Sequence, residues 1–153
     1  MSSAVYPGSI DPVHNGHVDI AARASKVFSR LVIGVYDDTE GDRMFSVQER
    51  VKLCEESTSK LQNVEVLSFS GLTTSFARAE GAEFIVRGLR AGFDFELEFG
   101  MALMWRNLAR DIDVVCMMSA LEYQFIYSSR IKEVARLGGE IDGLVPPAVA
   151  AAL

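Results

Sequence analysis

The chain has 153 residues, a length typical of one domain, and 49% of them are hydrophobic and 24% charged. This composition is that of a globular protein and excludes a disordered or collagen-like chain. The 15 basic and 21 acidic residues give a net charge of −6, which argues against binding to nucleic acid or to an anionic membrane. The longest apolar stretches, 114–118 and 144–153, fall short of the ~20 residues of a membrane helix.

The N-terminal residues lack the features of a signal peptide, and the two cysteines, Cys54 and Cys116, belong to no metal-binding or disulfide pattern. We therefore expect a single cytoplasmic domain over residues 1–153, with no nucleic-acid or membrane partner and with both thiols reduced.

Short apolar segments alternate with longer segments of helical period along the chain. The predicted strands are 4–6, 31–36, 64–69, 84–87 and 114–118, and the predicted helices are 16–28, 46–59, 73–80, 94–109 and 128–137. Ser46 and Glu49 form a capping box at the start of the second helix, and Gly81 provides a left-handed end for the third.

This alternation predicts right-handed βαβ crossovers. The expected fold is a single Rossmann-like α/β domain, a five-stranded parallel sheet with helices on both faces. Ligands of such sheets bind beyond the carboxyl ends of the strands, so the segments that follow the strands are the candidate site.

The segment after the first strand contains a predicted Pro7-Gly8 turn and then His14-x-Gly16-His17 at the start of a helix. Neither GxGxxG nor GxxxxGK[ST] occurs, which argues against a dinucleotide site and a P-loop. A helix N-terminus attracts phosphate, and a histidine in its first turn can donate a hydrogen bond to a phosphate oxygen. The alternative is that both histidines are only caps or surface residues.

Two more segments carry candidate phosphate ligands. Arg87-Gly88-Leu89-Arg90 follows the fourth strand, and its arginines either cradle phosphate or balance the acidic residues 94–98. Ser128 and Ser129 follow the fifth strand, where capping of the next helix is the better explanation, although their hydroxyls can also bind phosphate. The acidic residues between 37 and 42 are interpreted as a solvated loop rather than a metal site.

Five segments together resemble the bacterial phosphopantetheine adenylyltransferases, which belong to the HxGH nucleotidylyltransferase superfamily. They are YPGSIDPxHNGH at 6–17, MFSxxER at 44–50, RGLRA at 87–91, DFE at 94–96 and KEVA at 132–135. HxGH alone indicates only the superfamily, whereas RGLR followed by DFE indicates the family. The resemblance extends in register over nearly the whole chain.

The resemblance implies transfer of the adenylyl group of ATP to 4′-phosphopantetheine, giving dephospho-coenzyme A and pyrophosphate, the penultimate step of coenzyme A synthesis. It also implies Mg²⁺ with ATP, no covalent enzyme intermediate, no protein-built metal site, and a homohexamer. His17 is the implied catalytic residue, as stabiliser of the transition state at the α-phosphate. The implied ATP-binding residues are Ser9, Ile10, His17, Gly88, Leu89, Arg90, Glu98, Tyr123, Gln124, Phe125, Ile126, Tyr127, Ser128 and Ser129. The implied acceptor-binding residues are Ser9, Thr73 and Arg87.

The chain departs from the family at Gly41, where the family usually has a lysine that contacts the acceptor. Arg43 either supplies the missing cation or pairs with Asp42 or Glu40 at the surface. Two other functions stay open: a nucleotidylyltransferase for a different acceptor, such as a phosphorylated alcohol or nicotinamide mononucleotide, and a non-catalytic regulator that binds a nucleotide or coenzyme A.

Overall fold

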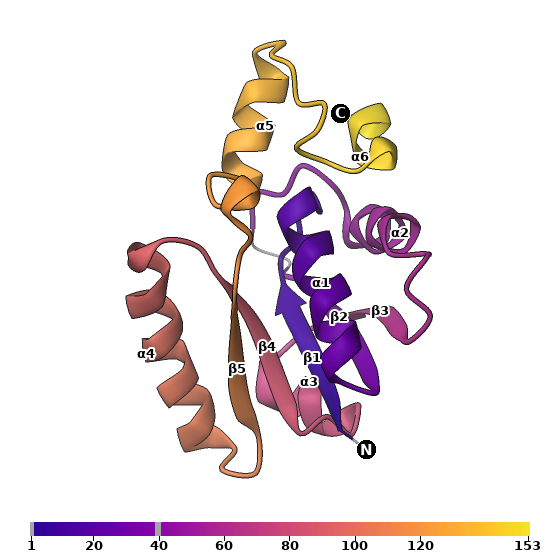
Figure 1. The fold of residues 1–153 in the computed structure, drawn as a ribbon. Coiled ribbons are helices and arrows are strands. Elements are labelled where there is room, and N and C mark those ends of the chain that lie inside the picture. The colour runs from indigo at the N-terminus through magenta and orange to yellow at the C-terminus, as the bar shows by residue number, and fades with distance from the viewer. Residues whose placement is uncertain (1, 39–40) are drawn as a thin grey trace.

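The computed structural model describes residues 2–38 and 41–153, and its five strands form one parallel sheet in the order β3-β2-β1-β4-β5 (Figure 1). The strands are β1 (Ser3–Gly8), β2 (Arg30–Tyr36), β3 (Val64–Phe69), β4 (Phe84–Leu89) and β5 (Asp113–Met118). The helices are α1 (Asn15–Val27), α2 (Val47–Ser57), α3 (Thr73–Ala79), α4 (Gly92–Leu108), α5 (Ser128–Arg136) and α6 (Pro147–Ala152), with the 3₁₀ turn η1 (Leu121–Tyr123) before α5. No helix in the described part of the chain is long and apolar enough to cross a membrane.

Two hydrophobic cores cover the two faces of the sheet. Alternate strand residues divide between them, as Ala4 and Tyr6 face one core and Val5 faces the other. Ile20 of α1 and Leu53 of α2 pack in the first core, and α3 and the end of α4 pack in the second. The predicted fold class, an α/β sheet with helices on both faces, is therefore confirmed.

The strand order reverses between β1 and β4, because the chain runs from β1 to β2 on one side and from β4 to β5 on the other. A ligand crevice forms beyond the carboxyl ends of the strands at such a point. The helices α5 and α6 stand above this end of the sheet (Figure 1). The segments after β1 and β4, together with α5, therefore surround the expected crevice.

Some predicted boundaries were wrong. β1 continues through Pro7 and Gly8, which pair with Gly34 and Val35 of β2, so no Pro-Gly turn ends it. β4 continues through Gly88 and Leu89, so that of the RGLR segment only Arg90 follows the strand. The sixth helix, α6, was not predicted; the Pro147 at its N-terminus was a usable signal, since proline fits the first helical turn.

Candidate functional site

A cavity of about 380 Å³ opens at the switch point, and segments far apart in the sequence line it. The predicted residues that it brings together are Ser9, Ile10, His17, Arg87, Gly88, Arg90, Glu98, Tyr123, Tyr127, Ser128 and Ser129. Four cationic side chains take part in the lining, and each is paired with a carboxylate: Arg43 with Asp38, Arg87 with Glu98, Arg90 with Asp94, and Lys132 with Asp11. The cavity is suited to an anionic ligand on a protein of net negative charge.

His14 and His17 form a capping box at the start of α1. Nδ1 of His14 accepts the amides of Gly16 and His17, at 3.1 and 3.3 Å, and Nδ1 of His17 accepts the amide of His14 at 3.1 Å. The proton of the neutral His17 ring is therefore on Nε2, which makes this nitrogen a hydrogen-bond donor. His17 also lines the cavity, so capping and ligand binding, which the sequence offered as alternatives, are compatible in one residue.

Both histidines are held in the neutral form. Burial lowers the pKa of His14 to about 3, with a further contribution from the positive charge of Arg90. Burial, and then His14, Arg90 and Arg87, lower the pKa of His17 well below its ordinary value. His17 is therefore a neutral hydrogen-bond donor. The positive charge of the site comes from arginine and lysine instead.

The two arginines of the RGLR segment are fixed by different partners. Arg87 forms two 2.8 Å hydrogen bonds with the carboxylate of Glu98 and a 2.7 Å bond with the carbonyl oxygen of Pro7. Glu98, one of the predicted ATP ligands, lines the cavity, and its carboxylate also orients Arg87, so that the pair connects β4 to α4.

Arg90 is held on the side of the cavity formed by the segment before α5. Its Nε is 2.8 Å from Asp94, its Nη1 donates to the carbonyl oxygen of Ile126, and its guanidinium lies 3.6 Å from the ring centroid of Tyr127. Asp94 and Glu98 thus each bind an arginine of the RGLR segment, as one of the two alternatives predicted, and both arginines also line the cavity.

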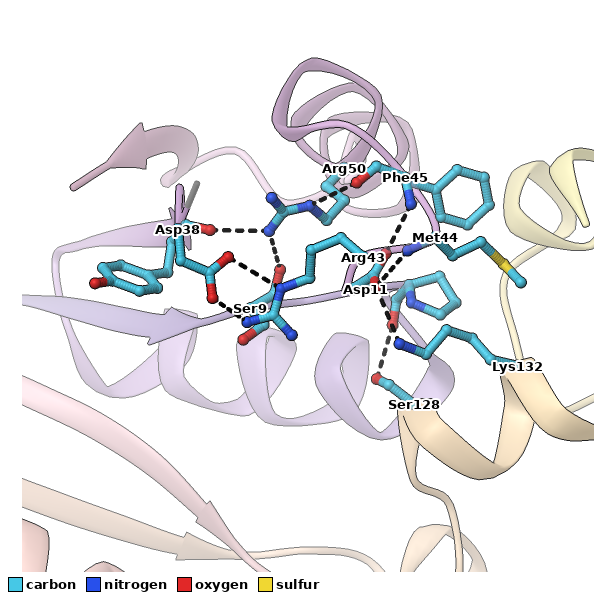
Figure 2. Close-up of polar contacts among 11 residues, drawn as sticks. Ser9, Asp11, Asp38, Arg43, Met44, Phe45, Arg50, Ser128 and Lys132 are labelled. Carbon is cyan, nitrogen blue, oxygen red and sulfur yellow. Dashed lines mark hydrogen bonds and ion pairs between the residues drawn. The ribbon is translucent and has the colours of Figure 1, made fainter. Parts of the chain in front are cut away.

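Ser128 and Ser129 line the cavity, but the prediction that they cap α5 was wrong. The N-terminal boundary residue of α5 is Tyr127, and no side chain caps this helix. The Ser128 hydroxyl instead donates a 3.0 Å hydrogen bond to the carbonyl oxygen of Pro12 (Figure 2). This bond ties α5 to the loop that follows β1.

The loop after β2 is attached to the same site by two buried charges (Figure 2). Asp11, which is 2% exposed, accepts the amides of Met44 and Phe45 at 2.9 and 3.0 Å. Arg50, which is 3% exposed, donates to the carbonyl oxygens of Ser9, Tyr36 and Phe45 at 2.7, 2.9 and 3.2 Å. These bonds fix Ser9 and the Met44–Phe45 turn relative to each other.

Arg43 lies in the cavity wall and also forms an ion pair, although its partner is neither of those predicted. Asp38 accepts hydrogen bonds from two of the guanidinium nitrogens, and the third points away from Asp38 (Figure 2). Glu40 lies outside the described residues. Arg43 therefore lies in the wall of the cavity that Ser9 and Arg87, two of the predicted acceptor ligands, also line.

Five of the predicted residues do not line the cavity: Thr73, Leu89, Gln124, Phe125 and Ile126. Thr73 begins α3, and Ile126 is buried with its carbonyl oxygen bound to Arg90. Sequence reasoning assigned no role to Lys132, Asp11 or Arg50, although all three belong to the family-like segments. The spacing of Lys132, one helical turn after Ser128 and Ser129, was the signal that could have found it.

The described residues contain no group of three or more histidine, cysteine or acidic side chains that could hold a metal ion. The carboxylates of Asp11 and Glu98, which line the cavity, are both bound to cations. These residues fit a Mg²⁺ ion that arrives on the phosphates of a nucleotide, because Mg²⁺ retains several waters and commonly binds through substrate phosphates.

The sequence is similar to proteins of one enzyme family. The cytidylyltransferase-like family model matches residues 5–134. A phosphopantetheine adenylyltransferase of Thermomicrobium roseum is 54% identical, and the match covers 98% of this chain and 92% of the relative. Proteins of the same name from Moorella thermoacetica and Clostridium botulinum (strain Eklund 17B) are 52% and 51% identical, and the matches cover 97% and 95% of this chain and 93% and 92% of the relatives.

The fold is also that of a solved chain from Vibrio parahaemolyticus described as a nicotinate-nucleotide adenylyltransferase. The two structures superpose with a TM-score of 0.73 over 99% of this chain and 91% of the other, at 16% sequence identity. At this low identity the likeness extends to the fold alone.

Proposed function

Because the chain belongs to the phosphopantetheine adenylyltransferase family, we propose that it transfers the adenylyl group of ATP to 4′-phosphopantetheine, giving dephospho-coenzyme A and pyrophosphate. The observation that carries this proposal is the neutral His17 donor on the wall of a cavity that four cations also line. The proposed location is the cytoplasm.

The arrangement suits a direct transfer between two phosphates. An oxygen of the acceptor phosphate attacks the α-phosphorus of ATP, and the bond from that phosphorus to the α–β bridging oxygen breaks, so that pyrophosphate leaves with the electron pair. Both reactants are anions, and catalysis therefore depends on positioning and on donors aimed at the developing charge. Nε2–H of His17 is such a donor at the α-phosphate.

The two ends of the cavity suit two substrates. Ser9, Arg43 and Arg87 form the proposed acceptor side, where Arg50 holds the carbonyl oxygen of Ser9. Arg90 and the segment before α5 form the proposed ATP side, since Arg90 is packed on Tyr127. A Mg²⁺ ion carried by the ATP phosphates would neutralise part of their charge, while Arg90 and the other cationic residues of the cavity would bind the phosphate oxygens.

The proposed assembly is a homohexamer. The observation that supports association is an exposed apolar surface on α4, comprising Phe95, Leu97, Phe99, Met101, Leu103, Met104 and Leu108, each at least 44% exposed. Apolar surface of this extent marks an interaction site. Light scattering of the purified chain would measure the assembly directly.

Release of pyrophosphate from ATP tests the proposed activity. The assay compares 4′-phosphopantetheine, glycerol phosphate and nicotinamide mononucleotide as acceptors, with His17→Ala as the inactive control. Release only with phosphopantetheine supports the proposal, and release with another acceptor assigns a different nucleotidylyltransferase. ATP binding without release for any acceptor would indicate the non-catalytic regulator.

A further inference from the structure

We propose that the hydroxyl group of Tyr6 binds a ribose hydroxyl of ATP and so makes the site selective for ribonucleotides over deoxyribonucleotides. The inference rests on the proposed function and gives a role to a residue to which neither the motifs nor the comparisons assign one. It begins from the position of this tyrosine between the core and the cavity. Tyr6 is 7% exposed and packs in the first core, and it also lines the cavity.

The hydroxyl of Tyr6 makes no hydrogen bond within residues 2–38 and 41–153. Nε of Arg23 is the one fully enclosed side-chain nitrogen or oxygen in these ranges that lacks a partner, so the Tyr6 hydroxyl is not sealed in the core but is open to the cavity. Burial raises the pKa of Tyr6 above its ordinary value, although the positive charge of Arg87 acts in the opposite direction. The group therefore stays protonated, and it can both donate and accept a hydrogen bond.

Gly88 leaves the space beside this hydroxyl free. It belongs to β4, the neighbour of β1 in the sheet. A Cβ at Gly88 would lie 3.8 Å from the hydroxyl oxygen of Tyr6 and 3.4 Å from Cγ1 of Ile20, and all three residues line the cavity. Because glycine has no side chain, a ligand that rests on β4 at this point comes within reach of the hydroxyl.

The surroundings of the hydroxyl favour a sugar over a phosphate. The side chains beside Gly88 are the uncharged Ile20 and Tyr6. Arg87 precedes Gly88, but its guanidinium lies 5.9 Å from the ring centroid of Trp105, which packs against the second core on the other face of the sheet. A ribose hydroxyl is a neutral donor and acceptor, and it therefore matches the phenol hydroxyl better than an anion does.

The distance from His17 agrees with a contact to the ribose. The ring centroids of Tyr6 and His17 are 6.4 Å apart. Nε2–H of His17 is the proposed donor to the α-phosphate, and the ribose is the group of ATP that is joined to this phosphate on the nucleoside side. A nucleotide whose α-phosphate is bound to His17 thus has its sugar close enough for Tyr6 to reach.

Binding of ATP, 2′-deoxy-ATP and 3′-deoxy-ATP to the wild type and to Tyr6→Phe tests this inference. The variant removes one oxygen from the protein, and each analogue removes one oxygen from the sugar. Titration calorimetry with Mg²⁺ and without acceptor measures the Kd of each pair. The wild type should bind one of the two deoxynucleotides about 5- to 100-fold more weakly than ATP, because that analogue leaves the buried hydroxyl without a partner. In Tyr6→Phe this preference should largely disappear, since ATP binding weakens toward that of the deoxynucleotide.

Tyr36→Phe is the matched control. It removes the same oxygen from a half-buried tyrosine that does not line the cavity, and it should keep the preference of the wild type for ATP. A structural role for the Tyr6 hydroxyl predicts that Tyr6→Phe is less stable and binds all three nucleotides more weakly by the same factor. We instead expect urea unfolding to show no loss of stability, because the hydroxyl has no hydrogen bond to lose in the free chain.

Two results would overturn the inference: equal binding of ATP and both deoxynucleotides by the wild type, or an undiminished preference for ATP in Tyr6→Phe. The outcome is independent of the acceptor. A wild-type chain that binds ATP but releases no pyrophosphate with phosphopantetheine would contradict the proposed function, while the comparison of sugars would still decide the role of Tyr6. A wild-type chain that releases pyrophosphate, with the same sugar preference in Tyr6→Phe, would contradict only this inference.

Discussion

The rings of His14 and His17 stack with their centroids 3.7 Å apart and their planes inclined by 22°, and each ring accepts the backbone amide of the other residue. This reciprocal capping fixes the orientation of the His17 ring. The orientation of the proposed catalytic donor is therefore set by the beginning of α1 itself, before any substrate binds.

Replacement of His17 by alanine should lower kcat about 10²- to 10³-fold, which is the usual effect of removing one preorganised donor to a developing charge. The fold and the affinity for ATP should be largely retained, because the cations of the cavity remain. Steady-state kinetics together with ATP titration measure the two effects separately. Near-normal turnover of His17→Ala would exclude the role assigned to this residue.

Neither histidine should titrate near pH 6.5 in the folded chain, because both pKa values are lowered. Since the chain has only two histidines, their Cε1–H resonances in NMR spectra between pH 5 and 8 are simple to assign. The unfolded chain binds protons at these sites where the folded chain does not. The histidine contribution to stability is thus complete above pH 6.5 and is lost as the pH falls from 6.5 toward about 3. A histidine resonance with a midpoint near 6.5 would contradict this prediction.

Arg87→Ala should mainly raise the KM for the acceptor, and Arg90→Ala should mainly raise the KM for ATP. Each increase should be about tenfold or more, because each variant loses at least one charged hydrogen bond to its substrate. Both guanidiniums pair with carboxylates of α4, but Arg87 also binds the carbonyl oxygen of Pro7 in β1, whereas Arg90 also binds that of Ile126 in the segment before α5. Kinetics with each substrate varied in turn measure this division. Because Arg87→Ala leaves the Glu98 carboxylate unpaired, Arg87→Ala/Glu98→Gln is the matched variant. Equal changes in both Michaelis constants would refute the division.

Arg43→Ala should weaken binding of phosphopantetheine, and the addition of Gly41→Lys should restore it. A side chain at position 41 would place its Cβ 2.8 Å from Asp38 Oδ2 and 3.0 Å from Arg43 Nε, so the lysine is better accommodated once Arg43 is removed. Calorimetry with phosphopantetheine measures both changes, with the exposed Arg110→Ala as control. Unchanged acceptor affinity in Arg43→Ala would show that this arginine serves only its pair with Asp38.

Gly34→Ala should destabilise the fold by about 1–3 kcal/mol through overpacking. A Cβ at this position would lie 2.5 Å from Phe76 and 3.0 Å from Phe69, whose rings stack with centroids 4.3 Å apart over the centre of β2. Urea unfolding measures the change. Gly100→Ala is the control, because nothing lies within 4 Å of its Cβ and alanine favours the helix α4. Equal stability of Gly34→Ala and the wild type would contradict the packing described for this face.

The parts of the fold that local chemistry decides were predictable from the sequence. Ser46 and Glu49 form the predicted capping box, and Gly81 has the positive φ of 68° expected of a left-handed end. The apolar segments became strands because helices cover both faces of the sheet.

Features decided by pairing between distant segments were not predictable in this way. The sequence predicts that Gly88 lies in the loop after the fourth strand. In the structure it extends β4, because it pairs with Met117 of β5. The bond from Ser128 to Pro12, which replaces the expected cap, joins residues 116 positions apart. Likewise, the sequence offers balance of the two arginines by the acidic residues 94–98 as one alternative, but it does not identify the pairs Arg87–Glu98 and Arg90–Asp94, because these form only once α4 has packed.

The contact between α1 and the segment before α6 has a consequence for the order of folding. Asn15, at the start of the helix that carries His17, binds the carbonyl oxygens of Gly143 and Leu144 at 2.8 and 2.9 Å, the former across 128 residues of sequence. During synthesis the N-terminal strands and α1 leave the ribosome long before this segment exists, and domains fold as their residues become available. The beginning of α1 therefore emerges early but reaches its final anchoring only when the last part of the domain docks. Contacts of such long range also slow folding, because a large loop must close before they form. The start of α1 thus gains these two anchoring bonds only when residues 143–144 dock, whereas the capping bonds that orient the His17 ring need residues 14–17 alone.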